Sequence, residues 1–333
     1  MNHLKLFFKC ILKWEKMMKK SLSILLALAC AVSFSFTSCT KKADGKLKIG
    51  IIQLVEHVAL DQSYQGFVDG LKEAGYEDGK NIVIDYQNAQ GEQVNCVTIA
   101  EKLVNDRSDL ILAIATPAAQ AVANLTSTIP VLVTAVTDPE SAKLVKSNAK
   151  PETNVSGTSD LTPCAAQMDL LKKIVPNAKK VGMLYCSSEQ NSHFQIALAK
   201  EACAKLGLEC VDGTVSNSNE IQQVTQSLCG KVDAIYAPTD NMIAAGMATV
   251  AQVAIENKIP VIVGESGMCT AGGLATYGIN YYELGKQTAK MAVEILKDGK
   301  KPADMPIQYL EKCDLSVNED TAKAIGITIP ENL

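Results

Sequence analysis

Two short apolar segments, each ending at a threonine and a proline, constrain the fold of this chain more than any other feature. The first covers residues 113–120 and reads Ala-Ile-Ala-Thr-Pro-Ala-Ala-Gln; the second covers residues 131–139 and ends in Val-Thr-Asp-Pro. Apolar runs of this length are typical of parallel strands buried on both faces. A proline in the first turn of a helix needs no N–H partner. We therefore expect each segment to be a strand followed by a helix.

The two turns are expected to lie at the carboxyl ends of their strands, where open α/β sheets bind ligands. Thr116 and Thr137 each supply a hydroxyl there, and Ala118 and its neighbours supply backbone N–H groups. A helix N-terminus of this kind attracts anions. The sequence therefore predicts that these turns hold the negative end of a small molecule.

Strand and helix patterns alternate through the rest of the chain, in two rounds that meet near residue 157. This alternation predicts an α/β fold with doubly wound parallel sheets. Expected helices include 64–74, 242–256 and 282–297. The last strand and helix are too few for a separate domain, so they should complete existing sheets. We predict an N-terminal lobe of residues 47–157 plus 272–306 and a C-terminal lobe of residues 158–271 plus 307–333.

Residues 1–38 differ from the remainder and have the pattern of a signal peptide. A basic start at residues 17–20 precedes the uncharged apolar run 22–36, which is short for a membrane-spanning helix. Phe36-Thr37-Ser38-Cys39 is similar to a bacterial lipobox, in which Cys39 carries lipid. Cys30 is a weaker alternative, and plain secretion is the competing interpretation. Residues 39–46 are polar and predict a flexible tether between lipid and domain.

Charge and cysteine content exclude several classes of function. Without the six lysines and one glutamate of residues 1–38, 26 basic and 35 acidic residues remain, a net charge of −9. This balance, without a basic cluster, argues against a nucleic-acid partner. The eight cysteines beyond Cys39 show no C-x-x-C spacing, so we expect no metal site and mostly free, buried thiols.

Polar side chains follow the expected strands of both lobes, as a cleft between two lobes requires. Acidic residues among them suit a cation, and the hydroxyls suit an anion, so together they predict a zwitterion such as an amino acid. For each residue the competing interpretation is a helix N-cap. The candidate ligand-binding residues are Glu56, His57, Thr116, Pro117, Ala118, Thr137, Asp138, Ser159, Asp160, Ser188, Glu189, Asp240, Asn241 and Glu265.

No catalytic or nucleotide-binding motif accompanies these residues. His57 has no serine or cysteine nucleophile motif beside it, which favours a structural or ligand-contacting histidine. Neither G-x-G-x-x-G after the first strand nor G-x-x-x-x-G-K-[ST] occurs. We therefore expect a binding protein without cofactor or metal rather than an enzyme.

Six stretches carry a resemblance to a known family. From about residue 47 to the end, the chain resembles the ABC transporter substrate-binding proteins of the tryptophan/tyrosine type, which have a type I periplasmic-binding-protein fold. Val58 stands where proline is usual in that family, and Asn280 where aspartate is usual. The stretches are 53–61, 113–120, 134–139, 157–160, 236–241 and 275–285.

The resemblance implies two lobes joined by three crossovers, with the ligand trapped between them by hinge closure. It implies an extracytoplasmic, lipid-anchored monomer that delivers an aromatic amino acid to a membrane permease driven by an ATPase. In that interpretation Thr116, Ala118 and Thr137 hold the carboxylate, and Asp240, helped by Glu265 or Glu189, holds the ammonium. A hydrolase on the same fold and a ligand sensor for a membrane receptor are the alternatives.

Overall fold

The computed structural model describes residues 45–333. The expected signal peptide, Cys39 and nearly all of the expected tether lie outside the described residues. Residues 46–333 form one compact unit. Within the described part of the chain, none of the helices has the length and apolar character needed to cross a membrane.

The first sheet has six strands, all paired in parallel, in the order β11-β5-β4-β3-β1-β2. Every residue of β3, β4 and β5 is buried, which explains their continuous apolar or small-residue sequences. The strands are β1 (Leu47–Gln53), β2 (Ile82–Asn88), β3 (Leu110–Ile114), β4 (Val131–Val136), β5 (Val155–Ser159) and β11 (Gln308–Tyr309).

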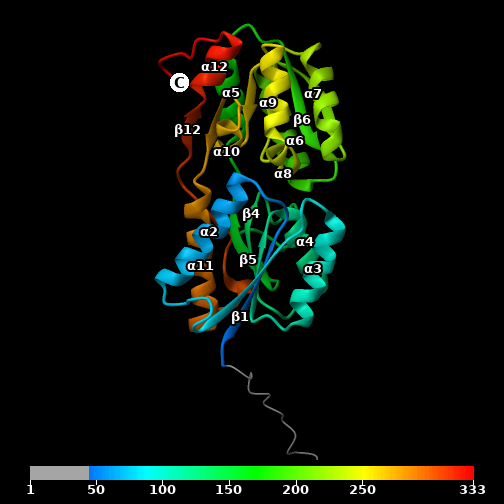
Figure 1. Ribbon diagram of the computed structural model, residues 1–333. Coiled ribbons are helices and arrows are strands. Elements are labelled where there is room, and N and C mark those ends of the chain that lie inside the picture. The colour runs from blue at the N-terminus through cyan, green and yellow to red at the C-terminus, as the bar shows by residue number, and fades with distance from the viewer. Residues whose placement is uncertain (1–44) are drawn as a thin grey trace, which may run out of the picture. The chain divides into compact units, whose positions relative to one another are not determined.

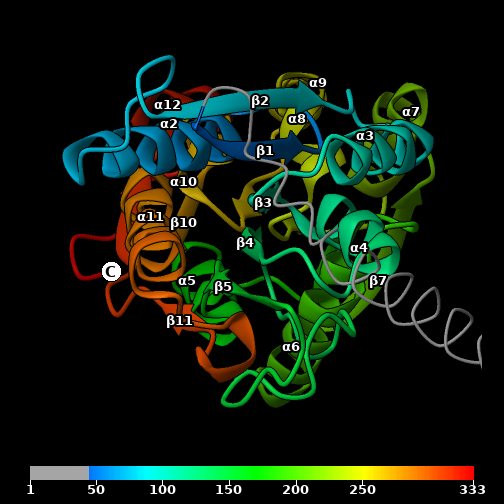
Figure 2. The same cartoon turned by 90° about the horizontal axis from the view of Figure 1, so that it is seen from below.

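Helices cover both faces of this sheet, α2 and α11 on one side and α3 and α4 on the other (Figure 2). The pair α2–α11 packs unusually closely, because a Cβ at Gly66 would lie 2.0 Å from the carbonyl oxygen of Tyr282. Only glycine permits that approach. The helices are α2 (Val58–Glu73), α3 (Gln93–Asn105), α4 (Thr116–Leu125) and α11 (Tyr281–Asp298).

The second sheet also has six strands, in the order β12-β10-β9-β8-β6-β7, and only β12 runs antiparallel. Its helices α5 and α6 pack together, as do α7 and α9 (Figure 1). The elements are β6 (Lys180–Cys186), β7 (Glu209–Val215), β8 (Ala234–Ala237), β9 (Val261–Val263), β10 (Ala275–Gly278), β12 (Asp314–Val317), α5 (Cys164–Ile174), α6 (Gln190–Lys205), α7 (Ile221–Cys229), α8 (Asn241–Ala245), α9 (Met247–Glu256), α10 (Ser266–Thr270) and α12 (Glu319–Ile325).

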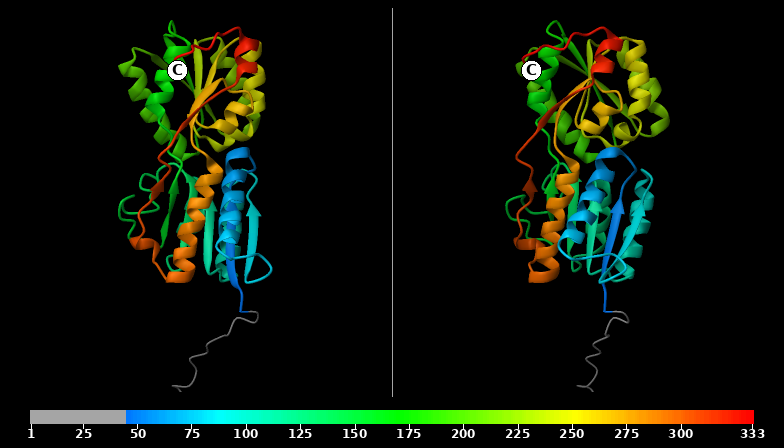
Figure 3. Two further views of the ribbon diagram at one scale, coloured as in Figure 1. Left: turned by 90° about the vertical axis from the view of Figure 1, so that its left-hand side faces the viewer. Right: turned by 60° about the vertical axis from the view of Figure 1, so that its left-hand side comes forward.

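The chain passes between the two sheets three times, through residues 160–163, 279–280 and 310–313 (Figure 3). The two-sheet α/β architecture agrees with the sequence prediction, but the lobe boundaries differ. The predicted N-terminal lobe contained β10, which pairs in the second sheet, and the predicted C-terminal lobe contained β11, which pairs in the first. Both strands are very short, so their sequences carry little information about which sheet they join.

The helix that we expected after β4 is absent from the structure, which has turns and loop there. The Asp138 side chain explains the difference. Its Oδ1 accepts the Ser141 N–H at 2.6 Å and its Oδ2 accepts the Asn148 amide at 2.7 Å, which closes a loop instead of capping a helix. The expected helix 242–256 is divided into α8 and α9 at Gly246, whose missing Cβ leaves room for Ile221.

Candidate functional site

The strand ends of the two lobes meet across a closed interface. His57 Nε2 lies 3.3 Å from Asn241 Oδ1, and Thr137 Oγ1 lies 3.4 Å from Thr239 Oγ1. Further bridges join the Gln93 amide to the Ser188 carbonyl at 3.2 Å, Gln120 to Gln190 at 2.8 Å, and Gln190 to the Ser141 carbonyl. These hydrogen bonds connect residues of the first lobe to residues of the second, so the lobes are in a closed arrangement.

The turn after β3 holds a strained backbone and an unpaired hydroxyl. Ala115 precedes α4 with φ 82° and ψ 155°, a conformation that non-glycine residues rarely adopt. Thr116 opens the helix, and Pro117 lies in its first turn, as expected. The Thr116 Oγ1 is buried and has no hydrogen-bond partner. Strain and an orphan hydroxyl at one turn are typical of a site that is completed by a ligand.

The turn after β4 is shaped by a bulge in the strand. Pairing of β4 with β5 shifts register between Val133 and Val136, where Ala135 has φ 52°. Thr137, the next residue after the strand, is buried and receives a hydrogen bond from Gln195 at 3.2 Å. The bulge thereby directs Thr137 towards the second lobe.

Asp160, in the first crossover, is a buried carboxylate with one free oxygen. Its Oδ2 accepts the Tyr281 hydroxyl at 2.8 Å, whereas its Oδ1 is buried without a partner. Burial raises the pKa of Asp160 to about 6, and the Tyr281 and Thr137 side chains offset part of that shift. Ser159 beside it is structural, because its hydroxyl donates to the Thr137 carbonyl at 2.7 Å and accepts the Leu161 N–H.

The acidic residues of the second lobe that we predicted as ligand contacts accept hydrogen bonds from their own lobe. The Asp240 carboxylate caps α8 through the Ile243 N–H at 2.8 Å and accepts the Cys186 N–H and the Ser192 hydroxyl, each at 2.6 Å. Glu265 likewise accepts the N–H groups at the start of α10, including that of Met268 at 2.7 Å. Both residues are therefore the N-caps that we set out as the competing interpretation.

Glu189 is engaged in the same way. Its Oε1 accepts the Met242 N–H at 3.0 Å, and its Oε2 accepts the Asn241 N–H at 3.1 Å and the Asn191 amide at 3.0 Å. Desolvation raises the pKa of Glu189 to about 7, and the nearby Asp240 charge adds to that rise. Asp240, predicted to hold an ammonium with help from Glu265 or Glu189, is thus committed to backbone and hydroxyl donors.

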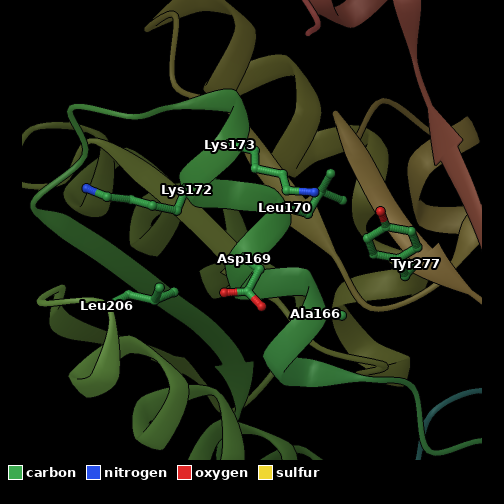
Figure 4. A pocket seen from close by; sticks show the side chains of 7 residues that line it. All are labelled: Ala166, Asp169, Leu170, Lys172, Lys173, Leu206 and Tyr277. Carbon is green, nitrogen blue, oxygen red and sulfur yellow. The ribbon is translucent and has the colours of Figure 1, made fainter. Parts of the chain in front are cut away.

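The remaining predicted residues are distributed between the cleft and the surface. Glu56 and Ser188 are exposed, whereas Ala118 is buried. A cavity of about 520 Å³ lies between the lobes. The predicted residues that line it are Pro117, Ser188, Glu189 and Asn241, whereas His57, Thr116 and Asp160 are not among its lining residues. A second pocket, of about 420 Å³, lies beside α5 (Figure 4) and includes none of the predicted residues. The Lys172 ammonium in this pocket donates a hydrogen bond to the Ala178 carbonyl at 2.8 Å.

Two polar groups that the sequence interpretation overlooked belong to the same region. Gln53 ends β1 fully buried, and Asn191 lies in the first turn of α6. The sequence signal that could have identified Gln53 is a glutamine directly after an apolar run that is expected to be a buried strand. Among the described residues, the buried side-chain atoms without a partner are Gln53 Oε1, His57 Nδ1, Thr116 Oγ1, Asp160 Oδ1 and Asn191 Oδ1.

Solved structures similar to this chain include bound and open forms. An ABC domain in complex with L-Trp from Streptococcus pneumonia is 42% identical, with a TM-score of 0.83 over 86% of this chain and 96% of that one. The ligand-free, open structure of a substrate binding protein with adhesive properties from Clostridium difficile is 49% identical, with a TM-score of 0.66 over 86% and 97%. The higher score against the L-Trp complex, despite lower identity, agrees with the closed arrangement of the lobes.

Sequence comparisons agree with the structural ones. A tyrosine-binding protein of Clostridioides difficile (strain R20291) is 44% identical over 322 residues, which cover 93% of this chain and 93% of that protein. A family model described as ABC transporter substrate binding protein matches residues 48–333. These findings confirm both the predicted family and the predicted fold of two α/β lobes, and the chain belongs to the ABC transporter substrate-binding proteins.

Proposed function

We propose that this protein captures an aromatic amino acid, tyrosine or tryptophan, between its lobes and delivers it to an ABC permease. Two relatives support the ligand class, one described as tyrosine-binding and one solved with L-Trp. The observation that carries the proposal is the set of buried, unpartnered polar atoms at the strand ends, four of them in the first lobe and the first crossover. Such atoms are costly unless a ligand or an ordered water satisfies them.

The spacing of these atoms suits an α-amino acid. Asp160 follows β5 and Thr116 follows β3, and the sheet places β4 between these strands. Two strand spacings are about 10 Å; subtracting two hydrogen bonds of about 2.9 Å leaves roughly 4 Å. That is the scale of the separation between an ammonium and a carboxylate on one carbon. Asp160 Oδ1 would accept the ammonium, and Thr116 Oγ1 with the α4 N-terminus would donate to the carboxylate.

This assignment revises the role that the sequence suggested for Asp240. A carboxylate that already accepts three short hydrogen bonds has little capacity left for an ammonium, whereas Asp160 retains one whole oxygen. Glu265 lies close enough for its charge and that of Asp160 to interact, so it adds negative potential at the ammonium position. Thr137 and Ser159 would position the Asp160 turn.

The proposal includes no chemical step. The hydrolase alternative requires His57 beside a serine or cysteine nucleophile, but the His57 ring faces the Asn241 amide. Export, lipid attachment through Cys39, a monomeric state and partnership with a permease and its ATPase remain parts of the proposal that follow from the family and the leader sequence. Mass spectrometry of the processed N-terminus tests the lipid, and genomic neighbours separate a permease partner from a sensor's receptor.

A thermal-shift screen against all amino acids tests the ligand class. A ligand at a hundredfold excess over its Kd stabilises a protein by about 2.7 kcal/mol. The chain's one tryptophan, Trp14, lies in the leader. In a Trp14→Phe variant, added L-tryptophan is therefore the sole indole emitter, and its fluorescence reports binding directly. A shift with sugars or nucleosides but with no amino acid would contradict the proposal.

A further inference from the structure

His57 lies at the opposite end of the row of strand-end groups from Asp160, and it joins the two lobes. It is the N-cap residue of α2, four residues beyond the end of β1, and its side chain makes no cap hydrogen bond. Its Nε2 lies 3.3 Å from Asn241 Oδ1 in the second lobe, and its Nδ1 is buried without a partner. Which ring nitrogen carries the proton decides what the other nitrogen can bind.

The hydrogen bonds between Asn241 and Glu189 indicate which ring nitrogen of His57 carries the proton. Glu189 accepts two backbone N–H groups, one on each oxygen, so both of its oxygens act as acceptors. The Asn241 side chain reaches the same Glu189 Oε2 at 2.5 Å, and when Glu189 is ionised the group that it presents there is its amide nitrogen. Its oxygen consequently points at His57 Nε2, which must be the donor. The hydrogen of a neutral His57 is therefore on Nε2, and Nδ1 is a bare acceptor.

The charge state agrees with this assignment. Burial lowers the pKa of His57 to about 4, so the imidazole is neutral at physiological pH. In a neutral ring whose Nε2–H donates to Asn241, the Nδ1 nitrogen keeps one lone pair, and this nitrogen is buried. A buried acceptor without a donor costs free energy that a ligand donor would recover.

The sheet order gives the scale of the distance between the ammonium site and this lone pair. The strands β5, β4, β3 and β1 are consecutive neighbours, so Asp160 and His57 follow strands three spacings apart, about 14 Å. Subtracting a hydrogen bond at each end leaves roughly 8 Å for the ligand itself. Extended tyrosine spans a distance of this order from its ammonium to its phenol oxygen, whereas a short aliphatic amino acid does not.

We propose that His57 Nδ1 is the specificity-determining acceptor of the cleft, selecting amino acids whose aromatic side chain ends in a hydrogen-bond donor, the phenol O–H of tyrosine or the indole N–H of tryptophan, over phenylalanine. The inference rests on the proposed function and goes beyond it, because it names the atom that distinguishes the side chain of one bound amino acid from that of another. A site built around a buried polar group rejects the analogue that lacks the matching donor more strongly than an apolar pocket can.

Calorimetry with L-tyrosine, L-tryptophan and L-phenylalanine tests the inference. We expect phenylalanine to bind about tenfold or more weakly than the tighter of the other two. His57→Leu and His57→Asn form a matched pair: both lose the bond from Nε2 to Asn241, but only asparagine keeps a hydrogen-bonding atom near the Nδ1 position. Discrimination should nearly vanish in His57→Leu and persist several-fold in His57→Asn.

Nuclear magnetic resonance of the wild-type protein, labelled with 15N at histidine, provides a readout that does not depend on either variant folding. The described chain has two histidines, His57 and His193, and a His193→Gln variant assigns their signals. We expect the Nε2–H tautomer at His57, with the Nδ1 resonance moving on addition of tyrosine or tryptophan and not of phenylalanine.

Four results would overturn the inference. Equal affinity for the three amino acids, an Nδ1–H tautomer, or unchanged discrimination in a folded His57→Leu would each remove His57 as the specificity-determining acceptor while leaving the proposed function intact. Absence of binding by any aromatic amino acid would remove both together.

Discussion

The two lobes offer polar strand ends of opposite character. In the second lobe the acidic residues Glu189, Asp240 and Glu265 are satisfied by backbone N–H groups and neighbouring side chains of that lobe. In the first lobe and the first crossover, Gln53, His57, Thr116 and Asp160 each keep a buried atom without a partner. We therefore propose that unsatisfied hydrogen-bonding capacity, rather than charge, marks the groups of the cleft that contact the ligand.

This difference suggests how the lobes divide the work. A lobe with free donors and acceptors is prepared for a ligand, whereas a lobe with internally capped acids presents a rigid surface that closes over it. Asn191 Oδ1 is the exception in the second lobe, and it lies beside Glu189. We expect the first lobe to bind the zwitterion and the second to complete the enclosure, a division consistent with hinge closure.

The largest effect expected from this comparison is on ligand affinity when Asp160 is changed. Asp160→Asn removes the charge that faces the ammonium, and a buried charge partner is worth about 3 kcal/mol or more. Isothermal titration calorimetry with L-tyrosine should show a Kd at least a hundredfold weaker. Retention of wild-type affinity in a folded Asp160→Asn protein would show that the free oxygen has no ligand role.

Asp240→Asn should produce the converse result, a loss of stability. The amide group cannot accept all of the donors that the carboxylate accepts from Cys186, Ser192 and Ile243. One or more buried donors would lose their acceptor, so we expect the free energy of unfolding to fall by about 2 kcal/mol, measured by urea titration. If stability is unchanged but binding is lost, Asp240 is a ligand contact and the comparison between the lobes fails.

Thr116→Val tests a single orphan hydroxyl with little change in shape. Valine removes the buried Oγ1 that has no partner, so the ligand-free protein should be as stable as the wild type or slightly more stable. Affinity should fall about tenfold, because the ligand carboxylate loses one donor. Thermal unfolding with and without ligand separates the two effects, and a variant that binds normally would exclude the hydroxyl from the site.

A smaller effect is expected from pH, with opposite signs for stability and binding. The folded pKa of Asp160 is raised to about 6, and those of Glu189 and Glu265 to about 7. At these three groups the folded state binds more protons than the unfolded state, whereas at His57, whose pKa is lowered to about 4, it binds fewer. The three carboxyl groups outnumber the one histidine, so ligand-free stability should fall as pH rises from about 4 to about 7. Ligand affinity requires ionised Asp160, so it should weaken roughly fivefold to tenfold between pH 7.5 and pH 5.

The measurement for this prediction is calorimetry of binding and urea unfolding at both pH values, with Asp160→Asn as the control. The variant should lose the pH dependence of affinity and part of that of stability. An affinity that is constant from pH 5 to pH 7.5 in the wild-type protein would contradict an ionised Asp160 partner.

Much of the fold could be predicted from the sequence, because strands buried in a parallel sheet consist of continuous apolar residues. The strand predicted within residues 131–139 matches β4, and the helix predicted over residues 282–297 matches α11 to within one residue at each end. The start of α2 was missed by six residues, because His57 and Val58 carry no capping signal. The short elements α10 and β12 are specified by their neighbours rather than by their own sequence pattern.

The site was accessible only in part, for a different reason. Asp160 and Asp240 both follow a strand, and sequence alone treats them alike. What distinguishes them is the set of donors that the fold brings to each. Asp240 accepts two backbone N–H groups and a hydroxyl, whereas among the described residues Asp160 accepts the Tyr281 hydroxyl on Oδ2 and keeps Oδ1 without a hydrogen-bond partner. The Ile243 N–H is a local N-cap donor, but the Cys186, Ser192 and Tyr281 donors come from distant parts of the chain, so local pattern cannot reveal them.

The most direct test of the central claim is a crystal structure of the protein with bound L-tyrosine or L-tryptophan. The account predicts the ammonium within hydrogen-bonding distance of Asp160 Oδ1 and the carboxylate at Thr116 Oγ1, with the capping bonds of Asp240 and Glu189 unchanged. An ammonium held by Asp240 or Glu189, or a ligand bound in the pocket beside α5, would contradict it.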